Sequence, residues 1–155
     1  KEDAIIFFND IDKEKIKFVL DNYKNAKFIK TDKIFETDID IFSPCALGGV
    51  VNSSSIPKFK FKIIAGAANN QLLDEKNDSE LLNQKNIFYV PDFLINAGGL
   101  INVYSEIADY SKSISIEKTK KIYQTTIKVF EKSQKELITT HQAALSIAKD
   151  ILRSS

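Results

Sequence analysis

Short apolar runs, each followed by small or polar residues, recur along the first part of the chain. They cover residues 4–8 (AIIFF), 27–29, 38–42 (DIDIF), 62–65 (KIIA) and 87–90. Continuous apolar runs such as AIIFF are typical of parallel strands buried on both faces. We therefore predict a strand at each run, and none at 56–61, because Pro57 lacks a backbone donor.

Helical periodicity separates and follows these runs. A stripe of Ile16, Val19, Leu20 and Tyr23 predicts a helix after the first strand, and Ser79 could cap a short helix that ends at Gln84. Beyond residue 90 the pattern is helical only. It predicts helices over 92–110, with Asp92 as the cap, over 115–135, and over 139–152, where Thr139 and Gln142 form a capping box.

Strands that alternate with helices or long connections predict one α/β domain. We expect a Rossmann-like, doubly wound parallel sheet closed by C-terminal helices from about residue 115. The chain has 155 residues and 43% hydrophobic content, which suits one ordinary core. In such folds a ligand binds outside the carboxyl ends of the strands.

Small and polar residues gather where the predicted strands end. These positions are Asp10, then 45–49, 66–70 and 96–99, the last carrying the glycine pair Gly98 and Gly99. Each interior glycine costs a helix about 1 kcal/mol, so a pair indicates that another element or a ligand approaches the backbone closely. A packing contact between helix and sheet is the alternative, but several such strand ends on one rim favour a ligand crevice.

An acid at the end of a strand in this fold can accept hydrogen bonds from the ribose hydroxyls of adenosine. Asp10 has that place, and its charge would repel the additional phosphate of NADP. The sequence therefore favours NAD as the cofactor.

Composition excludes several classes of protein. Formal net charge is +1, from 22 basic and 21 acidic residues, so we expect no nucleic-acid or membrane partner. The lone cysteine, Cys45, allows no internal disulfide and suits a reducing cytoplasm. His141 lacks a second histidine or a nearby cysteine, so we expect no metal site. Because the chain starts at Lys1 and contains no methionine, we expect it to be a piece of a longer polypeptide.

Three ordered blocks carry a family resemblance: DIFSPCALGGVVN at 40–52, IPKFKFKIIAGAANNQL at 56–72 and YVPDFLINAGGLINV at 89–103. They resemble the NAD-binding domain of the glutamate, leucine, phenylalanine and valine dehydrogenases, and within that family they are most similar to leucine dehydrogenase. The resemblance extends from Ala4 to about Asp109 and more weakly into the last helix.

The resemblance implies cofactor-binding roles. Asp10 would hold the adenosine ribose with Ile11 beside the adenine, and Cys45 and Ala46 would run along the adenosine half of NAD. At the other end, the resemblance places Asn70 near the nicotinamide ribose and the substrate amino group, and Asn96 at the nicotinamide.

Leu100 and Val103 match the positions that line the substrate side-chain pocket. An apolar pocket disfavours a substrate carboxylate, which would lose its hydration unpaired, and this argues against glutamate. The resemblance implies oxidative deamination of a branched-chain, leucine-like L-amino acid to the 2-oxo acid and ammonia. Family members usually carry the smaller valine at the position of Leu100, so valine or 2-aminobutyrate is an open alternative.

Two parts of such an enzyme are not found in the sequence. The glycine-rich phosphate loop and the strand before it are missing, and by the strand order 3-2-1-4-5-6 that strand would lie between the strands ending at Asp10 and at Phe42. No residue here is nominated as catalytic, because the family's catalytic lysine lies in an upstream substrate domain. We therefore expect residues 1–155 to be an N-terminally truncated NAD-binding domain, inactive alone, whose partners are the amino-acid substrate, the upstream domain and further copies in a homo-oligomer.

Two other functions stay open at this point. One is a non-catalytic nucleotide-binding or regulatory module. The other is an assembly module whose helical tail mediates association. A phenylalanine, valine or glutamate dehydrogenase is the alternative within the family.

Overall fold

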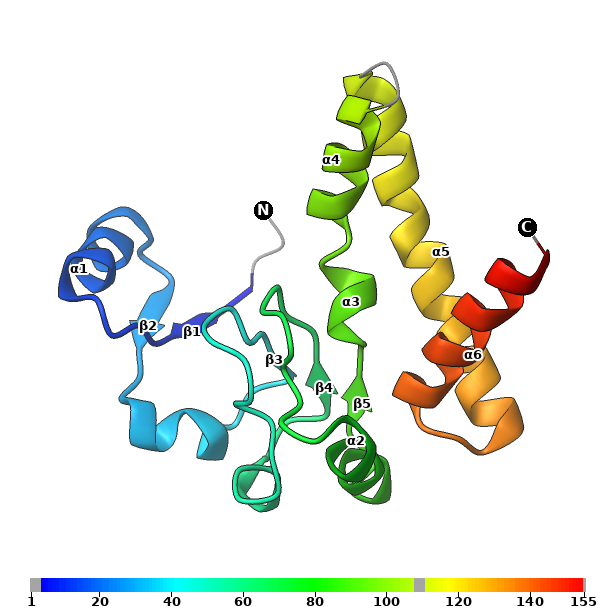
Figure 1. Cartoon of the computed structure of the whole chain (residues 1–155). Helices are drawn as coiled ribbons and strands as arrows, with labels where there is room; N and C mark the ends of the chain where they lie inside the picture. Colours follow the sequence, from blue (N-terminus) through cyan, green and yellow to red (C-terminus); the bar gives the residue numbers. More distant parts are fainter. Residues whose placement is uncertain (1–3, 108–110, 155) are drawn as a thin grey trace.

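The structure is a computed structural model that describes residues 4–107 and 111–154 (Figure 1). The strands are β1 (Ile6–Phe8), β2 (Ala26–Phe28), β3 (Ile41–Phe42), β4 (Ile63–Ile64) and β5 (Phe88–Tyr89). The α-helices are α1 (Lys13–Asn22), α2 (Glu75–Gln84), α3 (Asp92–Ile95), α4 (Gly98–Ile107), α5 (Lys112–Glu136) and α6 (Thr140–Ser154). Two 3-10 helices, η1 (Thr31–Glu36) and η2 (Ile56–Lys58), lie in the connections.

All strands pair in parallel, which confirms the predicted α/β class and all predicted strand positions. β1 pairs with β2, and separately β3, β4 and β5 form a sheet in that order. Segment 56–61 contains η2 instead of a strand, as the sequence indicates. β1 and β3 are not hydrogen-bonded to each other, so the described strands form two sheets, with the break at the place where we expect a further strand. That such a strand precedes this chain stays a prediction.

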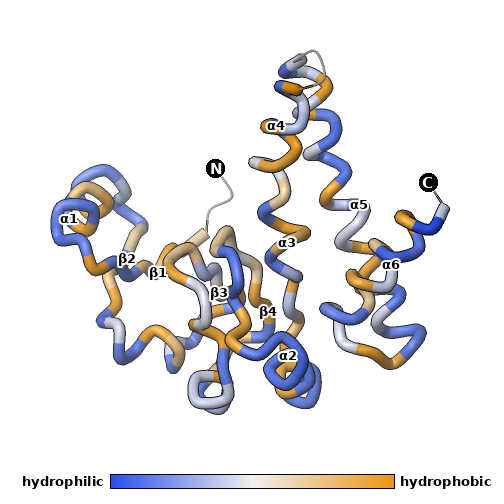
Figure 2. Tube along the Cα trace, viewed as in Figure 1, coloured by the Kyte–Doolittle hydropathy of each residue, from blue (hydrophilic) through white to orange (hydrophobic). Residues whose placement is uncertain are grey.

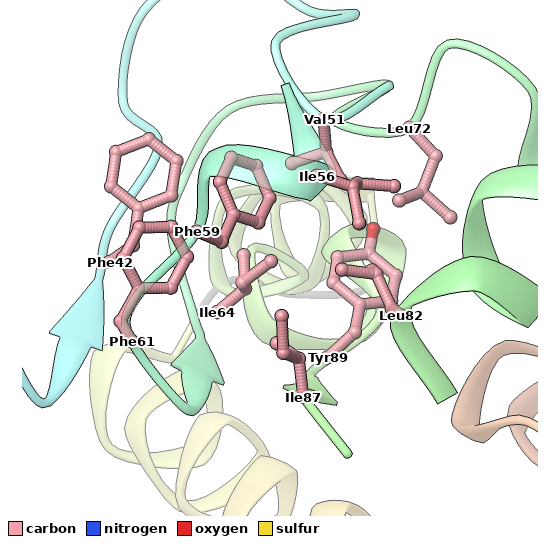
Figure 3. Packing of buried hydrophobic residues seen from close by; sticks show 10 residues of the cluster. All are labelled: Phe42, Val51, Ile56, Phe59, Phe61, Ile64, Leu72, Leu82, Ile87 and Tyr89. Atoms are coloured by element: carbon pink, nitrogen blue, oxygen red, sulfur yellow. The ribbon is translucent and has the colours of Figure 1, made fainter. Parts of the chain in front are cut away.

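Phenylalanine rings fill the space beside β3 and β4 (Figure 3). The ring centroids of Phe59 and Phe61 are 4.6 Å apart, and those of Phe42 and Phe61 are 5.0 Å apart. Ile64 of β4 and Leu82 of α2 are buried in the same cluster. The connection that contains η2 therefore contributes as much to this core as the short strands do.

The helix α1 packs less deeply than its apolar stripe predicts. Asp12 caps it, since one carboxylate oxygen accepts hydrogen bonds from the backbone N–H groups of Glu14 and Lys15 at 2.9 and 3.4 Å. Ile16 and Val19 are half-buried, but Leu20 and Tyr23 remain exposed. The helix contacts β2 in a sheet of only two strands, and this small sheet offers little surface to cover.

One predicted helix start and two predicted caps are wrong. The helix α2 begins at Glu75 with Asp74 as its cap, whereas Ser79 lies inside the helix and its hydroxyl donates to the Lys76 carbonyl. The helix α3 starts at Asp92, as predicted, but its N-cap is Pro91. The two Asp92 carboxylate oxygens accept from Phe93 N–H and from Gln71 N–H of another loop.

The single helix predicted over 92–110 is two helices. The turns at Asn96 and Ala97 separate α3 from α4, and the end of the predicted helix, 108–110, lies outside the described residues. The helix α4 and the first half of α5 form a hairpin that projects from the sheet (Figure 1). Orange, apolar positions are visible along α4 in Figure 2.

The last helix is attached to the sheet by its first turn. The predicted capping box is confirmed, because Gln142 N–H donates to the Thr139 hydroxyl and the Gln142 amide oxygen accepts from Thr139 N–H. The Thr140 hydroxyl donates to the Tyr89 carbonyl at 2.6 Å. A second small core of Val129, Ala143 and Ala144 packs α6 on α5.

Replacing Phe61 with alanine tests the aromatic core. We expect Phe61→Ala to lower the free energy of unfolding by roughly 3–5 kcal/mol, because it removes a fully buried ring and leaves a cavity among Phe42 and Phe59. Urea unfolding of the polypeptide that carries this chain measures the loss. Phe18→Ala is the control, since Phe18 on α1 is exposed and should change stability by about 0.5 kcal/mol or less. Equal losses for both variants would contradict this description of the core.

Candidate functional site at the strand ends

The loops that follow β3 and β4 touch through their backbones. Ala68 N–H donates to the Pro44 carbonyl at 2.9 Å. A Cβ atom placed on Gly66 would lie 2.3 Å from the Pro44 carbonyl oxygen and 2.4 Å from its nitrogen. Only glycine fits this position without displacing a backbone.

The segment 45–49 and Asn70 form a second backbone contact. Gly49 N–H donates to the Asn70 carbonyl at 2.7 Å, and a Cβ on Gly48 would lie 2.6 Å from that same oxygen. Gly49 and Asn70 both have positive φ angles, 74° and 52°. Asparagine tolerates this conformation better than most side chains, which gives the amide at position 70 a structural explanation.

The loop after β5 joins the same cluster through side chains. The Asn96 amide nitrogen donates to Asn69 Oδ1 at 2.5 Å and reaches the Ala67 carbonyl at 3.5 Å. The structure therefore brings together three of the four predicted strand ends. Sequence reasoning missed Asn69, and the signal available was that it stands beside Asn70 in the same loop.

Gln71 and Asp92 connect these loops through further hydrogen bonds. The buried Gln71 side chain donates from Nε2 to the carbonyls of Gly66 and Ala68, at 2.7 and 2.9 Å. Its backbone N–H donates to Asp92 Oδ2 at 3.2 Å. Asp92 N–H in turn donates to the hydroxyl of Tyr89, whose pKa burial raises above its ordinary value, so this phenol stays neutral. Neither Gln71 nor this role of Asp92 was predicted.

The predicted adenosine-side residues are exposed to solvent. Cys45 and Ala46 lie on the surface after β3, with Cys45 Sγ 3.5 Å from the Ser43 hydroxyl. Asp10 and Ile11 follow β1, in the other sheet. One Asp10 oxygen accepts from Asp12 N–H at 2.9 Å, and Ile11 is 93% exposed. Among the described residues, no hydrogen bond joins Asp10 to the three connected loops.

The two predicted substrate-pocket residues lie one helical turn apart on α4. Leu100 and Val103 are 73% and 55% exposed, so their apolar surfaces are uncovered. The glycine pair does not serve helix–sheet packing in the described part of the chain. A Cβ on Gly98 would meet Thr119 of α5 at 3.4 Å, an ordinary contact, and a Cβ on Gly99 would meet no described atom within 4 Å. The backbone at Gly99 is therefore open to a ligand or another part of the protein.

A metal-binding cluster and a membrane-spanning helix are both absent from the described residues. No group of three or more His, Cys, Asp or Glu side chains in 4–107 and 111–154 could hold a metal ion. His141 is buried, with Nε2 3.5 Å from a carboxylate oxygen of Glu75. In the same ranges no helix is both long and apolar enough to cross a bilayer.

Comparison with known proteins identifies the family. The sequence model of the Glutamate/Leucine/Phenylalanine/Valine dehydrogenases matches residues 7–151. The chain belongs to this family. It is 41% identical over its whole length to L-tryptophan dehydrogenase of Nostoc punctiforme and 39% identical over 96% of its length to leucine dehydrogenase of Thermoactinomyces intermedius. The chain spans only 44% and 40% of these two relatives.

Solved structures of the dehydrogenase family agree with the fold. The crystal structure of L-tryptophan dehydrogenase from Nostoc punctiforme superposes on 96% of this chain with a TM-score of 0.92 and 42% identity, and the match covers 44% of that structure. A hetero-hexameric glutamate dehydrogenase from Thermus thermophilus also matches, with a TM-score of 0.67. That match covers 88% of this chain and 35% of the glutamate dehydrogenase chain. At 17% identity this second match supports the fold alone.

Two glycine replacements separate packing from open surface at the site. We expect Gly66→Ala to lower the free energy of unfolding by roughly 1–3 kcal/mol, because its Cβ would overlap the Pro44 backbone. Gly99→Ala should leave stability unchanged or raise it by up to about 1 kcal/mol, since alanine favours the helix and meets no neighbour. Urea unfolding of both variants measures the difference. A Gly66→Ala variant as stable as Gly99→Ala would show that the two loops are not in backbone contact.

Proposed function

We propose that this chain is the cofactor-binding part of an NAD-dependent amino-acid dehydrogenase. The observation that carries the proposal is the joining of three strand-end loops, which gathers Asn69, Asn70 and Asn96 at one place in a chain of this family. Carboxamides at strand ends offer donors and acceptors to a dinucleotide that lies along the sheet.

The residues fit NAD at both of its ends. Asp10 would accept hydrogen bonds from the adenosine ribose, since one carboxylate oxygen is fixed by Asp12 N–H and the other has no hydrogen-bond partner among the described residues. Ile11, exposed beside it, would cover the adenine, with Cys45 and Ala46 along the same half. Asn70 and Asn96 would orient the nicotinamide end. When bound, NAD supplies the acceptor for a hydride from the substrate α-carbon.

The substrate is an L-amino acid with an apolar side chain, leucine-like and branched. Support comes from Leu100 and Val103, whose uncovered apolar surfaces on α4 suit an aliphatic group and give a carboxylate no partner. Asn70 would contact the substrate amino group. The products are the 2-oxo acid and ammonia, and an upstream substrate domain of the same polypeptide would supply the catalytic lysine.

An aromatic amino acid is the second candidate substrate. The 41% identity to L-tryptophan dehydrogenase is slightly higher than the 39% identity to leucine dehydrogenase, and phenylalanine dehydrogenases also match. A non-catalytic nucleotide-binding or assembly module is not favoured, because the relatives are dehydrogenases. A cytoplasmic location and a homo-oligomeric state stay predictions.

Turnover by the whole polypeptide tests the proposed function. We expect NAD reduction, followed at 340 nm, with leucine, valine and 2-aminobutyrate, and a kcat/KM for glutamate at least about 100-fold lower, since an unpaired carboxylate in an apolar pocket costs roughly 2–3 kcal/mol. Tryptophan and phenylalanine complete the panel. Preference for either aromatic substrate would replace the branched-chain assignment, and absence of turnover with every amino acid would contradict the proposed function. Residues 1–155 alone should show no turnover.

Asp10→Asn tests the choice between NAD and NADP. Removing the negative charge should lower the ratio of kcat/KM for NAD to that for NADP by roughly tenfold, which corresponds to about 1.4 kcal/mol. The reason is that the amide no longer repels the 2′-phosphate and binds the ribose hydroxyls less strongly. Asp21→Asn on the exposed surface of α1 is the matched control and should leave the ratio unchanged. An unaltered ratio in Asp10→Asn would remove Asp10 from the cofactor site.

A further inference from the structure

Among the described residues of the joined strand-end loops, the polar side chain of Gln71 is buried and cannot touch a ligand directly. Gln71 is fully buried, and its side-chain amide donates two hydrogen bonds to the loop that carries Asn69 and Asn70. A buried amide is costly unless it is hydrogen-bonded, and Gln71 Oε1 has no hydrogen-bond partner among the residues that the structure describes. The two hydrogen bonds from Nε2 therefore offset part of the free-energy cost of burying the amide. An apolar residue of similar size at this position would not have that cost.

Neighbouring carbonyls of this loop accept hydrogen bonds from different residues, Gln71 and Asn96. The carbonyls of Gly66 and Ala68 accept from Gln71, whereas the carbonyl between them, on Ala67, faces the Asn96 amide. With its inner carbonyls held, the loop places Asn69 Oδ1 within 2.5 Å of Asn96 Nδ2.

The backbone of Gln71 extends the same connection to α3. Its N–H donates to Asp92 Oδ2, and its carbonyl accepts from Val51 N–H at 3.0 Å. Asp92 begins the short helix α3, and Asn96 is the C-cap of that helix. One residue thus joins the loop after β4 to the helix that presents the amide of the next strand end.

We propose that Gln71 is a positioning residue, which holds the 66–70 loop against α3 so that Asn69, Asn70 and Asn96 keep a fixed arrangement toward the nicotinamide end of the cofactor. This role rests on the proposed function. Asn69 belongs to the same arrangement, because it accepts the hydrogen bond that orients the Asn96 amide. Since the adenosine half lies on other loops, Gln71 should affect kcat much more than the KM for NAD.

Gln71→Glu is the sharpest test, because it keeps the shape and replaces the donor by oxygen. An ionised carboxylate would face the carbonyls of Gly66 and Ala68 and, across the backbone, Asp92, so burial and these groups should raise the pKa of the introduced acid. The protonated acid can donate one of the two hydrogen bonds. We expect kcat of the whole polypeptide to fall roughly 10- to 100-fold at neutral pH, with less than about a threefold change in KM for NAD.

The pH profile distinguishes positioning from mere stabilisation. Relative to the unmodified protein, Gln71→Glu should recover activity as the pH falls through the raised pKa, and Gln71→Leu, which cannot donate, should show no recovery. Gln84→Glu, at an exposed position on α2, is the matched control and should behave as the unmodified protein. A folded Gln71→Glu variant with unchanged kcat and pH profile would overturn the proposal.

Hydrogen exchange keeps the test independent of the activity itself. In Gln71→Leu the backbone amides of 66–71 should exchange at least about tenfold faster than in the unmodified protein, and those of α6 should not change. Unmodified protein that turns over no amino acid would contradict the proposed function, while slow exchange in Gln71→Leu would contradict the role of Gln71.

Discussion

The site depends on the close approach of bare backbones at the ends of β3 and β4. Gly66 lies against Pro44, and Gly48 lies against the carbonyls of Asn69 and Asn70, at distances that exclude any side chain. Because these contacts join main chains, the loops cannot shift independently, and the amides they carry inherit a fixed spacing. The strands themselves contribute little length, since β3, β4 and β5 have two residues each.

Such short strands need support from other parts of the fold. Phe59 and Phe61 in the connection before β4 pack on Phe42, and Leu82 of α2 closes the same core. On the far side, Thr140 fixes α6 to the Tyr89 carbonyl, next to the turn where α3 begins. The core cluster, which contains Ile87 and Tyr89, and α6 thus both hold β5 and, through it, the start of the segment that leads to Asn96.

The sequence predicted every strand, because each is a local apolar run and parallel pairing follows from the alternation with helices. It also predicted the capping box at Thr139, which involves residues three apart. It misplaced the start of α2, because the polar run after Asp74 carries no apolar stripe. Asn69 and Gln71 were missed for a different reason: their roles consist of contacts to residues in other loops, such as Asn96 and Asp92, which no local pattern encodes.

The break between α3 and α4 separates two groups of side chains that a single helix would have held in one rigid unit. Asn96, at the end of α3, is held by Asn69, whereas Leu100 and Val103 lie beyond the break on a helix that contacts α5. Gly99 lies between them in the sequence, and a Cβ atom there would touch none of the described residues. If the cofactor and the substrate bind as proposed, the amide that orients nicotinamide is set by the rigid strand-end loops, and substrate size is set by the side chains of α4. Changes at Leu100 can then alter the preferred amino acid without moving the groups that hold the cofactor, and this provides a physical basis for relatives of similar identity that bear the names of tryptophan, leucine and phenylalanine dehydrogenases.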